Sequence, residues 1–217
     1  MSNDTKIILN KDEIEKHYFY RLIKRLFDIL ASFTGLVVLS PVFLIVAVAI
    51  KADDGGPVFY NQERVGKGGK HFKMYKFRSM RVNADQELND LIHQNEVDGA
   101  MFKIKNDPRI TRVGKFIRKT SIDEFPQLLN VLLGQMSIVG PRPPLPREVK
   151  LYTNYDRQRL FVRPGCTGLW QVTVRNSVGF HEMVNIDLEY IQKRGFWLDV
   201  KIMFRTIGII FAPNSAY

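Results

Sequence analysis

Two adjacent acidic residues, Asp123 and Glu124, follow the basic residues Arg118 and Lys119. Ser121 stands three residues before Glu124, the spacing of a capping box at the start of a helix. On that interpretation the two acids only complement the helix dipole. A helix N-terminus beside cations also binds phosphate, and a carboxylate there can serve as a nucleophile or as a ligand of Mg²⁺. On these residues alone both interpretations stay open.

A second candidate is the proline-rich loop from 140 to 146, in which Pro141 and Pro143 flank Arg142. Proline fixes its own φ angle, so the loop holds the arginine with little conformational freedom. A rigid guanidinium group is a good bidentate ligand for phosphate. A polyproline linker or a partner-binding motif explains the composition equally well.

The overall composition favours anionic partners. The 217 residues carry a formal net charge of +10, and 45% of them are hydrophobic, which excludes a disordered chain. The single cysteine, Cys166, excludes a disulfide scaffold and a cysteine-rich zinc site. Nucleic-acid binding would rest on net charge alone, and the apolar segment described next argues against it.

Residues 29–50 contain no charged side chain. At about 1.5 Å per residue, a helix over these 22 positions reaches about 33 Å, enough for the hydrocarbon core of a bilayer. The segment is too long for the apolar region of a signal peptide, and no small-residue cleavage site follows it.

Ser40 and Pro41 interrupt this segment in its middle. Proline removes a backbone donor, and serine can satisfy a freed carbonyl. Lys24 and Arg25 precede the segment and Lys51 follows it, so positive charge flanks both ends, as expected when both ends face the cytoplasm. We therefore predict a re-entrant hairpin, with a kinked spanning helix or a buried soluble helix as alternatives.

Short runs rich in Val, Phe and Tyr at 57–63 and 71–79 predict a β-hairpin joined by the glycine-rich segment 65–70. That segment lacks the spacing of a phosphate-binding loop. A turn is predicted over 53–57.

Apolar periodicity predicts a helix over 13–27 that continues into the apolar segment, and a surface helix over 83–95. The stretch 103–119 is strongly basic and suits anionic headgroups or a solvated face. Residues 196–211 form an amphipathic pattern that predicts either a helix lying flat on a membrane or an ordinary core-facing helix.

Several of these segments, in this order, resemble the bacterial sugar transferases, the monotopic polyprenyl-phosphate phosphoglycosyl transferases. The resemblance extends over residues 21–217. Its motifs are Lys24-Arg25-x-x-Asp28, Ser40-Pro41, Gly56-Pro57-Val58-Phe59, Lys76-Phe77-Arg78-Ser79-Met80, Arg118-Lys119-Thr120-Ser121-Ile122-Asp123-Glu124, Met136-Ser137-Ile138-Val139-Gly140-Pro141-Arg142-Pro143, Arg163-Pro164-Gly165 and Gly168-Leu169-Trp170-Gln171.

The resemblance implies an α+β, mostly helical fold with an N-terminal re-entrant membrane helix, a small β-hairpin and interfacial amphipathic helices. The expected organisation is a short N-terminal extension over 1–20, the membrane helix over 21–51 and a membrane-associated catalytic domain over 52–217. The form expected from the resemblance is the minimal catalytic one, without the preceding spanning helices of longer relatives. The expected location is the bacterial inner membrane, with the catalytic domain on the cytoplasmic face.

The activity implied is transfer of a sugar 1-phosphate from a UDP-sugar to undecaprenyl phosphate, with release of UMP. This is the first membrane step of a surface glycan such as a capsule, an exopolysaccharide or an O-antigen. By motif, Asp123 is the nucleophile that forms a covalent aspartyl phosphosugar, and Glu124 assists it. The same two carboxylates are expected to hold Mg²⁺, the implied cofactor.

The resemblance also assigns binding roles. Phosphates and nucleotide are expected to contact residues from three motifs: Lys76, Arg78, Arg118, Pro141, Arg142 and Pro143. Membrane topology is expected to depend on Lys24, Arg25, Ser40 and Pro41. Anionic membrane lipids are expected partners, and a homo-oligomer is compatible with the sequence.

Two positions depart from the family pattern, Val174 where a glycine is usual and Cys166 where a β-branched residue is common, and both bear on sugar choice. The sugar itself stays open. Two other functions remain as alternatives: a glycosyltransferase that releases UDP, although the chain has no Asp-x-Asp motif, and a non-catalytic membrane adaptor.

Overall fold

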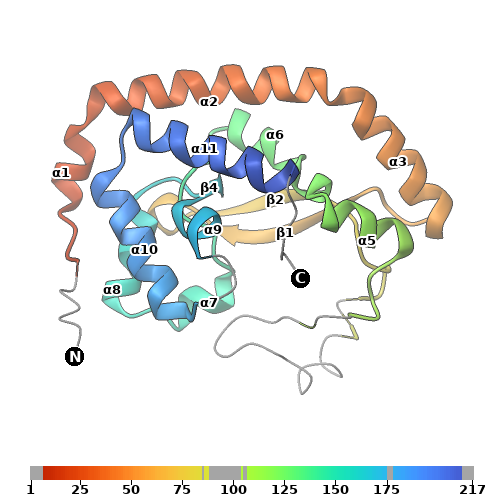
Figure 1. Cartoon of the computed structure of the whole chain (residues 1–217). Coiled ribbons are helices and arrows are strands. Elements are labelled where there is room, and N and C mark those ends of the chain that lie inside the picture. The colour runs from red at the N-terminus through yellow and green to blue at the C-terminus, as the bar shows by residue number, and fades with distance from the viewer. Residues whose placement is uncertain (1–6, 85, 88–103, 105–106, 175–177, 212–217) are drawn as a thin grey trace.

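The computed structural model describes residues 7–84, 86–87, 104, 107–174 and 178–211. Two helices end to end, α2 (Tyr18–Val38) and α3 (Ser40–Asp54), run along one side of the molecule, and the rest of the chain packs beneath them (Figure 1). The remaining elements are α1 (Lys11–Lys16), β1 (Phe59–Val65), η1 (Lys67–Gly69), β2 (His71–Phe77), α5 (Arg112–Lys119), η3 (Ile122–Glu124), α6 (Gln127–Leu132), β3 (Ser137–Val139), α7 (Pro146–Lys150), α8 (Asn154–Arg157), η4 (Gln158–Phe161), β4 (Gly165–Thr167), α9 (Leu169–Thr173), α10 (Phe180–Lys193) and α11 (Phe196–Phe211).

The apolar segment is a bent pair of helices. The predicted continuous helix from 13 is wrong, because the chain breaks at His17 between α1 and α2. The axes of α2 and α3 differ by 57°, and the break lies at Leu39. The hydroxyl of Ser40 donates to the carbonyl of Val37 (2.7 Å), and Pro41 lies in the first turn of α3, where its missing N–H costs no hydrogen bond. Among the described residues no single helix is long and apolar enough to cross a membrane, whereas this pair together meets that length and composition.

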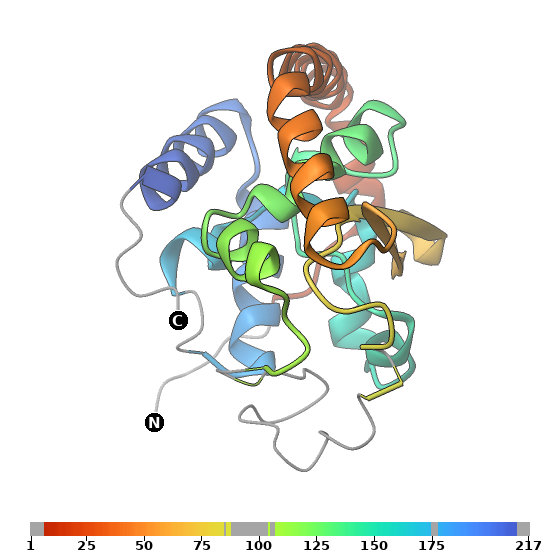
Figure 2. The ribbon, with the colours of Figure 1, turned by 90° about the vertical axis from the view of Figure 1, so that its right-hand side faces the viewer.

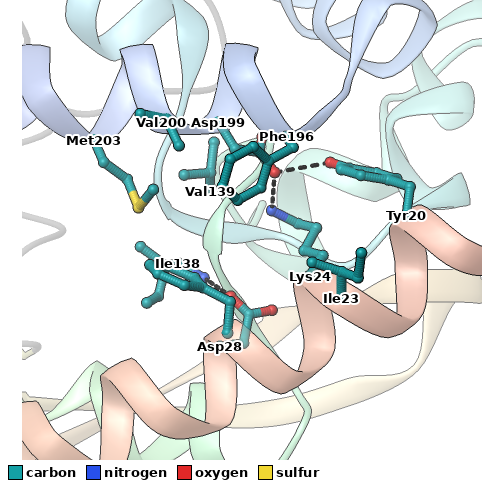
Figure 3. A pocket seen from close by; sticks show the side chains of 11 residues that line it. Tyr20, Ile23, Lys24, Asp28, Ile138, Val139, Phe196, Asp199, Val200 and Met203 are labelled. Carbon is teal, nitrogen blue, oxygen red and sulfur yellow. Dashed lines mark hydrogen bonds and ion pairs between the residues drawn. The ribbon is translucent and has the colours of Figure 1, made fainter.

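Polar contacts fix α2 to the body of the protein. The ammonium group of Lys24 lies 2.7 Å from a carboxylate oxygen of Asp199 in α11, and the hydroxyl of Tyr20 donates to the same oxygen (2.8 Å; Figure 3). Arg25 donates to two carbonyl oxygens at the end of α6, at 2.7 and 2.8 Å. One turn further, the buried carboxylate of Asp28 accepts bonds from β3. Seen along α2, α11 and α6 lie on its two sides (Figure 2).

The predicted hairpin is confirmed. β1 and β2 pair antiparallel from Phe59 opposite Phe77 to Val65 opposite His71. The glycine-rich segment forms the turn, in which Gly68 has a φ of 69°. A parallel pair of three-residue strands, β3 and β4, was not predicted from the sequence.

A small hydrophobic core brings α3, β2 and α5 together. It consists of Val46, Ile50, Phe77 and Ile117, all at most 5% exposed. Because Phe77 is in β2 and Ile117 in α5, this core sets the strand beside the helix that precedes Asp123. The contact is the framework of the candidate site.

The predicted helix over 196–211 is confirmed as α11. Phe196, Trp197 and Phe204 are at least half exposed, but Asp199 points into the body. The predicted helix over 83–95 falls mainly on residues outside those that the structure describes.

Candidate active site

Asp123 lies in η3, the short helical turn between α5 and α6. The predicted capping box is wrong, because the side chain of Ser121 makes no capping hydrogen bond and α5 has already ended at Lys119. Ser121 instead adopts the left-handed conformation, with φ at 57°, which costs about 1–2 kcal/mol for a residue with a Cβ. This tight reversal turns Asp123 inward, where it is only 8% exposed.

Glu124 forms an ion pair with Lys76 of β2, at 2.6 Å between Oε1 and Nζ. Burial by itself raises the pKa of Glu124, but the Lys76 ammonium, together with the charges of Arg142 and Arg64, more than offsets this, and the pKa is lowered. Glu124 is therefore an anion at neutral pH. The ion pair joins the β-hairpin to the turn that carries Asp123.

The pKa of Asp123 changes in the opposite direction. Burial raises it to about 6, and the negative charge of Glu124 adds to this rise, whereas Lys76 and Arg118 oppose it. Asp123 is thus mostly ionised at pH 7 but poorly hydrated. A carboxylate in this state is suited to nucleophilic attack on an electrophile that neighbouring cations hold in place.

Arg118, in the last turn of α5, supplies such a cation. Its charge acts on Asp123, and its buried Nη1 atom has no hydrogen-bond partner within the described chain. A buried N–H group without a partner is costly, and a phosphate oxygen would satisfy it.

The proline-rich loop brings a further cation. Pro141 and Pro143 are buried, and the positive charge of Arg142 acts on Glu124. Arg64 of β1 donates from Nη1 to the carbonyl of Pro143 (2.9 Å), which ties the loop to the hairpin. The loop thus holds Arg142 close enough to Glu124 for its charge to lower the pKa of that carboxyl.

Arg64 is a residue that the sequence interpretation missed. It is 5% exposed, and burial together with the neighbouring charge of Arg142 lowers its pKa to about 10. Its charge also acts on Glu124. The arginine is visible in the sequence of the predicted strand, but the strand pattern does not distinguish a buried arginine from an exposed one.

A close approach of two glycines places the proline-rich loop. The N–H of Gly140 donates to Thr167 of β4 (2.8 Å), and the N–H of Gly165 donates to Pro141 (2.9 Å). A Cβ on Gly165 would lie 2.1 Å from the backbone nitrogen of Gly140, so only glycine fits there.

A family model described as bacterial sugar transferase matches residues 19–213. The chain belongs to this family. The chain is similar to the undecaprenyl-phosphate galactose phosphotransferase of Salmonella typhimurium (44% identity; 91% of this chain and 42% of that protein) and to the UDP-glucose:undecaprenyl-phosphate glucose-1-phosphate transferase of Klebsiella pneumoniae (40%; 90% and 42%). The exopolysaccharide production protein ExoY of Rhizobium meliloti is 42% identical and matches over 90% of this chain and 88% of its own length.

The chain spans less than half the length of the galactosyl transferase of Streptococcus agalactiae and of most of these relatives. The resemblance seen in the motifs is nevertheless confirmed, because the family match covers nearly the whole chain.

Arg78, which the family motif suggested as a phosphate ligand, is engaged within the chain in this sugar transferase. Its guanidinium group forms a bidentate ion pair with Asp54 at the end of α3, and it also donates to the carbonyls of Pro57 and Met80. Its role in the structure is to fasten α3 to the end of β2.

Asn130 of α6 was also missed. It is fully buried, accepts from the N–H of Tyr75 (3.0 Å) and donates to the carbonyl of Lys73 (2.7 Å). These bonds hold α6 along β2 one residue before Lys76, so that the strand and the turn keep their register. An asparagine in a helical sequence pattern does not reveal that its side chain bonds to the backbone of a distant strand.

Among the described residues no group of three or more His, Cys, Asp or Glu side chains is placed to hold a metal ion alone. Asp123 and Glu124 offer two adjacent carboxylates. This donor set fits Mg²⁺, which usually takes one or two carboxylates and completes its shell with substrate phosphates and water. An open, mostly apolar cavity between α2 and α11 is lined by neither Asp123 nor Glu124.

Proposed function

We propose that this sugar transferase moves a sugar 1-phosphate from a UDP-sugar to undecaprenyl phosphate and releases UMP. The observation that carries the proposal is the buried Asp123, with a pKa of about 6, enclosed by Lys76 and Arg118. The names of the relatives from Salmonella and Klebsiella, which specify sugar-phosphate transfer to undecaprenyl phosphate, support it. The reaction would begin a surface glycan.

The proposed chemistry has two steps. A carboxylate oxygen of Asp123 attacks the β-phosphorus of the UDP-sugar, an O–P bond forms, and the bond from that phosphorus to the bridging oxygen breaks, so that UMP leaves with the electron pair. An oxygen of undecaprenyl phosphate then attacks the same phosphorus and frees the Asp123 carboxylate. Attack requires the ionised form, which predominates above about pH 6.

The surrounding residues have separate roles in this scheme. Arg118 and Arg142 would bind the phosphate oxygens, and Lys76 would hold Glu124 ionised beside the nucleophile. Mg²⁺ held by the two carboxylates and the diphosphate would neutralise the charge that accumulates on the leaving group. Pro141 and Pro143 would restrict Arg142 to one orientation near the uridine.

We further propose that α2 and α3 enter the bacterial inner membrane from the cytoplasmic face and return to it. Their bend of 57° and their exposed apolar side chains, among them Leu30, Phe33, Val37 and Leu44, support this. Lys24 and Arg25 contact the body of the protein, so they would keep the N-terminal half of α2 at the membrane interface. The hydroxyl of Ser40 donates to Val37 at the break between the two helices. Exposed aromatic residues of α11 would lie at headgroup depth beside it.

Nucleotide release from the chain in lipid nanodiscs tests the activity. With undecaprenyl phosphate, Mg²⁺ and a panel of UDP-sugars, we expect UMP from one donor, loss of UMP with Asp123→Asn or with EDTA, and no change with the exposed Asp12→Asn. Without undecaprenyl phosphate, mass spectrometry of the intact protein should detect the sugar phosphate bound to it. Release of UDP, or undiminished turnover by Asp123→Asn, would refute the scheme.

Cysteine labelling tests the topology. In a Cys166→Ala background, Asn10→Cys and Asp53→Cys lie on the two flanks of the helix pair. A membrane-impermeant maleimide should label both in inverted inner-membrane vesicles and neither in intact cells. Labelling of one from each side would mean a spanning helix.

A further inference from the structure

A second cluster of basic residues lines an open cavity beneath the N-terminal half of α2. Glu15 and Asp28 are its acidic residues. Its basic residues come from four parts of the chain: Arg21, Lys24, Arg25, Lys67, Arg163 and Arg194. The cations therefore outnumber the carboxylates, and neither Asp123 nor Glu124 lines this cavity.

The four arginines of this cavity have no carboxylate within ion-pair distance among the described residues. Each donates to a backbone carbonyl instead, as Arg163 does to Gly134 (2.9 Å) and Arg194 does to Ile14 (2.8 Å). Such bonds fix a guanidinium group but do not neutralise it. Asp28, the buried acid, accepts hydrogen bonds from β3.

Glu15 is already engaged as well. It pairs with Lys67 (3.1 Å). Lys24 pairs with Asp199 (2.7 Å), a carboxylate that does not line this cavity. The cavity thus retains an excess of positive charge. Because guanidinium groups offer several N–H donors each, the arginines keep donors for a further acceptor.

The arginines act on one another. Partial burial lowers the pKa of Arg163; the charge of Arg25 lowers it further, the carboxylate of Asp28 opposes this shift, and Arg21 adds a smaller lowering. Partial burial also lowers the pKa of Arg194, where Tyr20, Tyr190 and Asp199 oppose the shift and Arg21 adds to it. Arg21 is therefore the shared neighbour of the other two, and an anion placed among the three would remove their mutual repulsion.

The cavity is separate from the carboxylate pair. Lys67, which lines the cavity, is in the turn of the hairpin, whereas Lys76, which pairs with Glu124, is near the far end of β2. The five residue steps of strand from His71 to Lys76 span about 17 Å. On α2, the exposed apolar residues Phe19 and Leu22 are neighbours in sequence of the lining residues. If α2 lies in the membrane as proposed, the cavity opens at the depth of lipid headgroups.

We propose that this cavity binds the phosphate group of an anionic lipid between Arg21, Arg163 and Arg194, as a site distinct from the active site. The lipid source depends on the proposed membrane insertion, whereas the affinity for phosphate does not. Bound there, the lipid would hold the α1–α2 junction against the body, because Arg194 also contacts Ile14 of α1.

Binding to the purified full chain in neutral detergent tests the site. The probes are inorganic phosphate, dihexanoyl phosphatidylglycerol below its micellar concentration and dihexanoyl phosphatidylcholine, followed by ³¹P line broadening. We expect phosphatidylglycerol to bind, and Arg163→Gln with Arg21→Gln to weaken it about 10-fold or more. Arg163→Lys should retain most of the affinity, which separates lost charge from lost folding.

Two control variants locate the binding. Arg147→Gln removes the same charge from an exposed position of α7 and should bind both probes as the unmodified chain does. Arg118→Gln removes a phosphate contact proposed for the active site, so it should leave the binding of phosphatidylglycerol unchanged and can lower only the binding of inorganic phosphate at that other site. Phosphatidylglycerol binding without inorganic phosphate binding identifies a lipid site, and binding of both identifies a phosphate site that soluble anions also fill. Equal loss with Arg147→Gln, loss of phosphatidylglycerol binding with Arg118→Gln alone, or no binding of either anion would overturn the proposal. Because none of these assays requires turnover, they are independent of the proposed reaction.

Discussion

Replacing Asp123 by asparagine is expected to abolish turnover and, at the same time, to stabilise the folded chain. The two effects share one cause. The carboxylate is 8% exposed, so the folded protein holds a poorly hydrated negative charge that the reaction needs and the fold does not. Asparagine keeps the shape of the side chain and removes the charge.

The size of the effect follows from the pKa of Asp123. Burial raises it from 3.8 to about 6, and a tenfold change in proton affinity corresponds to about 1.4 kcal/mol. The folded state therefore binds this proton more tightly than the unfolded chain, and its stability falls as the pH rises between these two values. Above about pH 7 the cost is complete at about 3 kcal/mol, and near pH 5 it is about half of that.

Thermal unfolding at two pH values measures this cost. For a chain of this length 1 kcal/mol moves the midpoint by about 2–4 °C, so Asp123→Asn should unfold about 6–12 °C higher than the unmodified chain near pH 8, with a smaller gain near pH 5. The exposed Asp12→Asn should change the midpoint little at either pH. UMP release should fall at least about 1,000-fold. An unchanged or lowered midpoint near pH 8, or a gain that does not depend on pH, would contradict the reasoning.

Three further predictions concern the same framework. Initial rates of UMP release should rise with pH through about 6 and then level off, because Asp123 must be ionised; a flat profile between pH 5 and 8 would exclude it as the group that titrates. Lys76→Gln should move that rise to higher pH, since the Lys76 charge lowers the pKa of Asp123, and Lys76→Arg should restore its position. Gly165→Ala, whose Cβ would meet a backbone nitrogen at 2.1 Å, should lower the free energy of unfolding by about 3 kcal/mol, whereas Gly179→Ala, with no atom within 4 Å, should not; equal effects in denaturant titrations would argue against the close approach.

The sequence was sufficient for features that depend on short-range pattern. Runs rich in Val, Phe and Tyr around a glycine-rich turn predicted the hairpin, and the uncharged run interrupted by Ser40 and Pro41 predicted a break between two helices. The motifs named Asp123, Glu124 and Lys76, and the structure places Lys76 against Glu124; the catalytic roles of these residues stay predictions. In each case the signal lies within a few neighbouring residues, where periodicity and motif carry information.

The features that failed depend on contacts between distant segments. Ser121 fits a capping box locally, but it adopts the left-handed conformation and its side chain makes no capping hydrogen bond. The motif gave no sign that Arg78 pairs with Asp54, 24 positions earlier in the chain, and its role as a phosphate ligand stays a prediction. Arg64 and Asn130 carry no local sign of burial, because their partners lie 79 and 55 to 57 positions away.

The long helix α2 is part of the framework of the site, in addition to its proposed role in the membrane. Arg25 binds the end of α6, whose other end follows the turn that carries Asp123, and Asp28 binds β3, which leads into the loop of Arg142. A displacement of α2 would therefore move both α6, which follows the turn of Asp123 and Glu124, and the loop of Arg142. Buried polar groups have few other partners available, so the elements that they join take defined positions. We therefore expect the insertion of α2 in the bilayer to be coupled to the geometry around Asp123. If α2 is inserted as proposed, the competent geometry around Asp123 would form when the helix is seated in the bilayer, where the proposed lipid substrate is found.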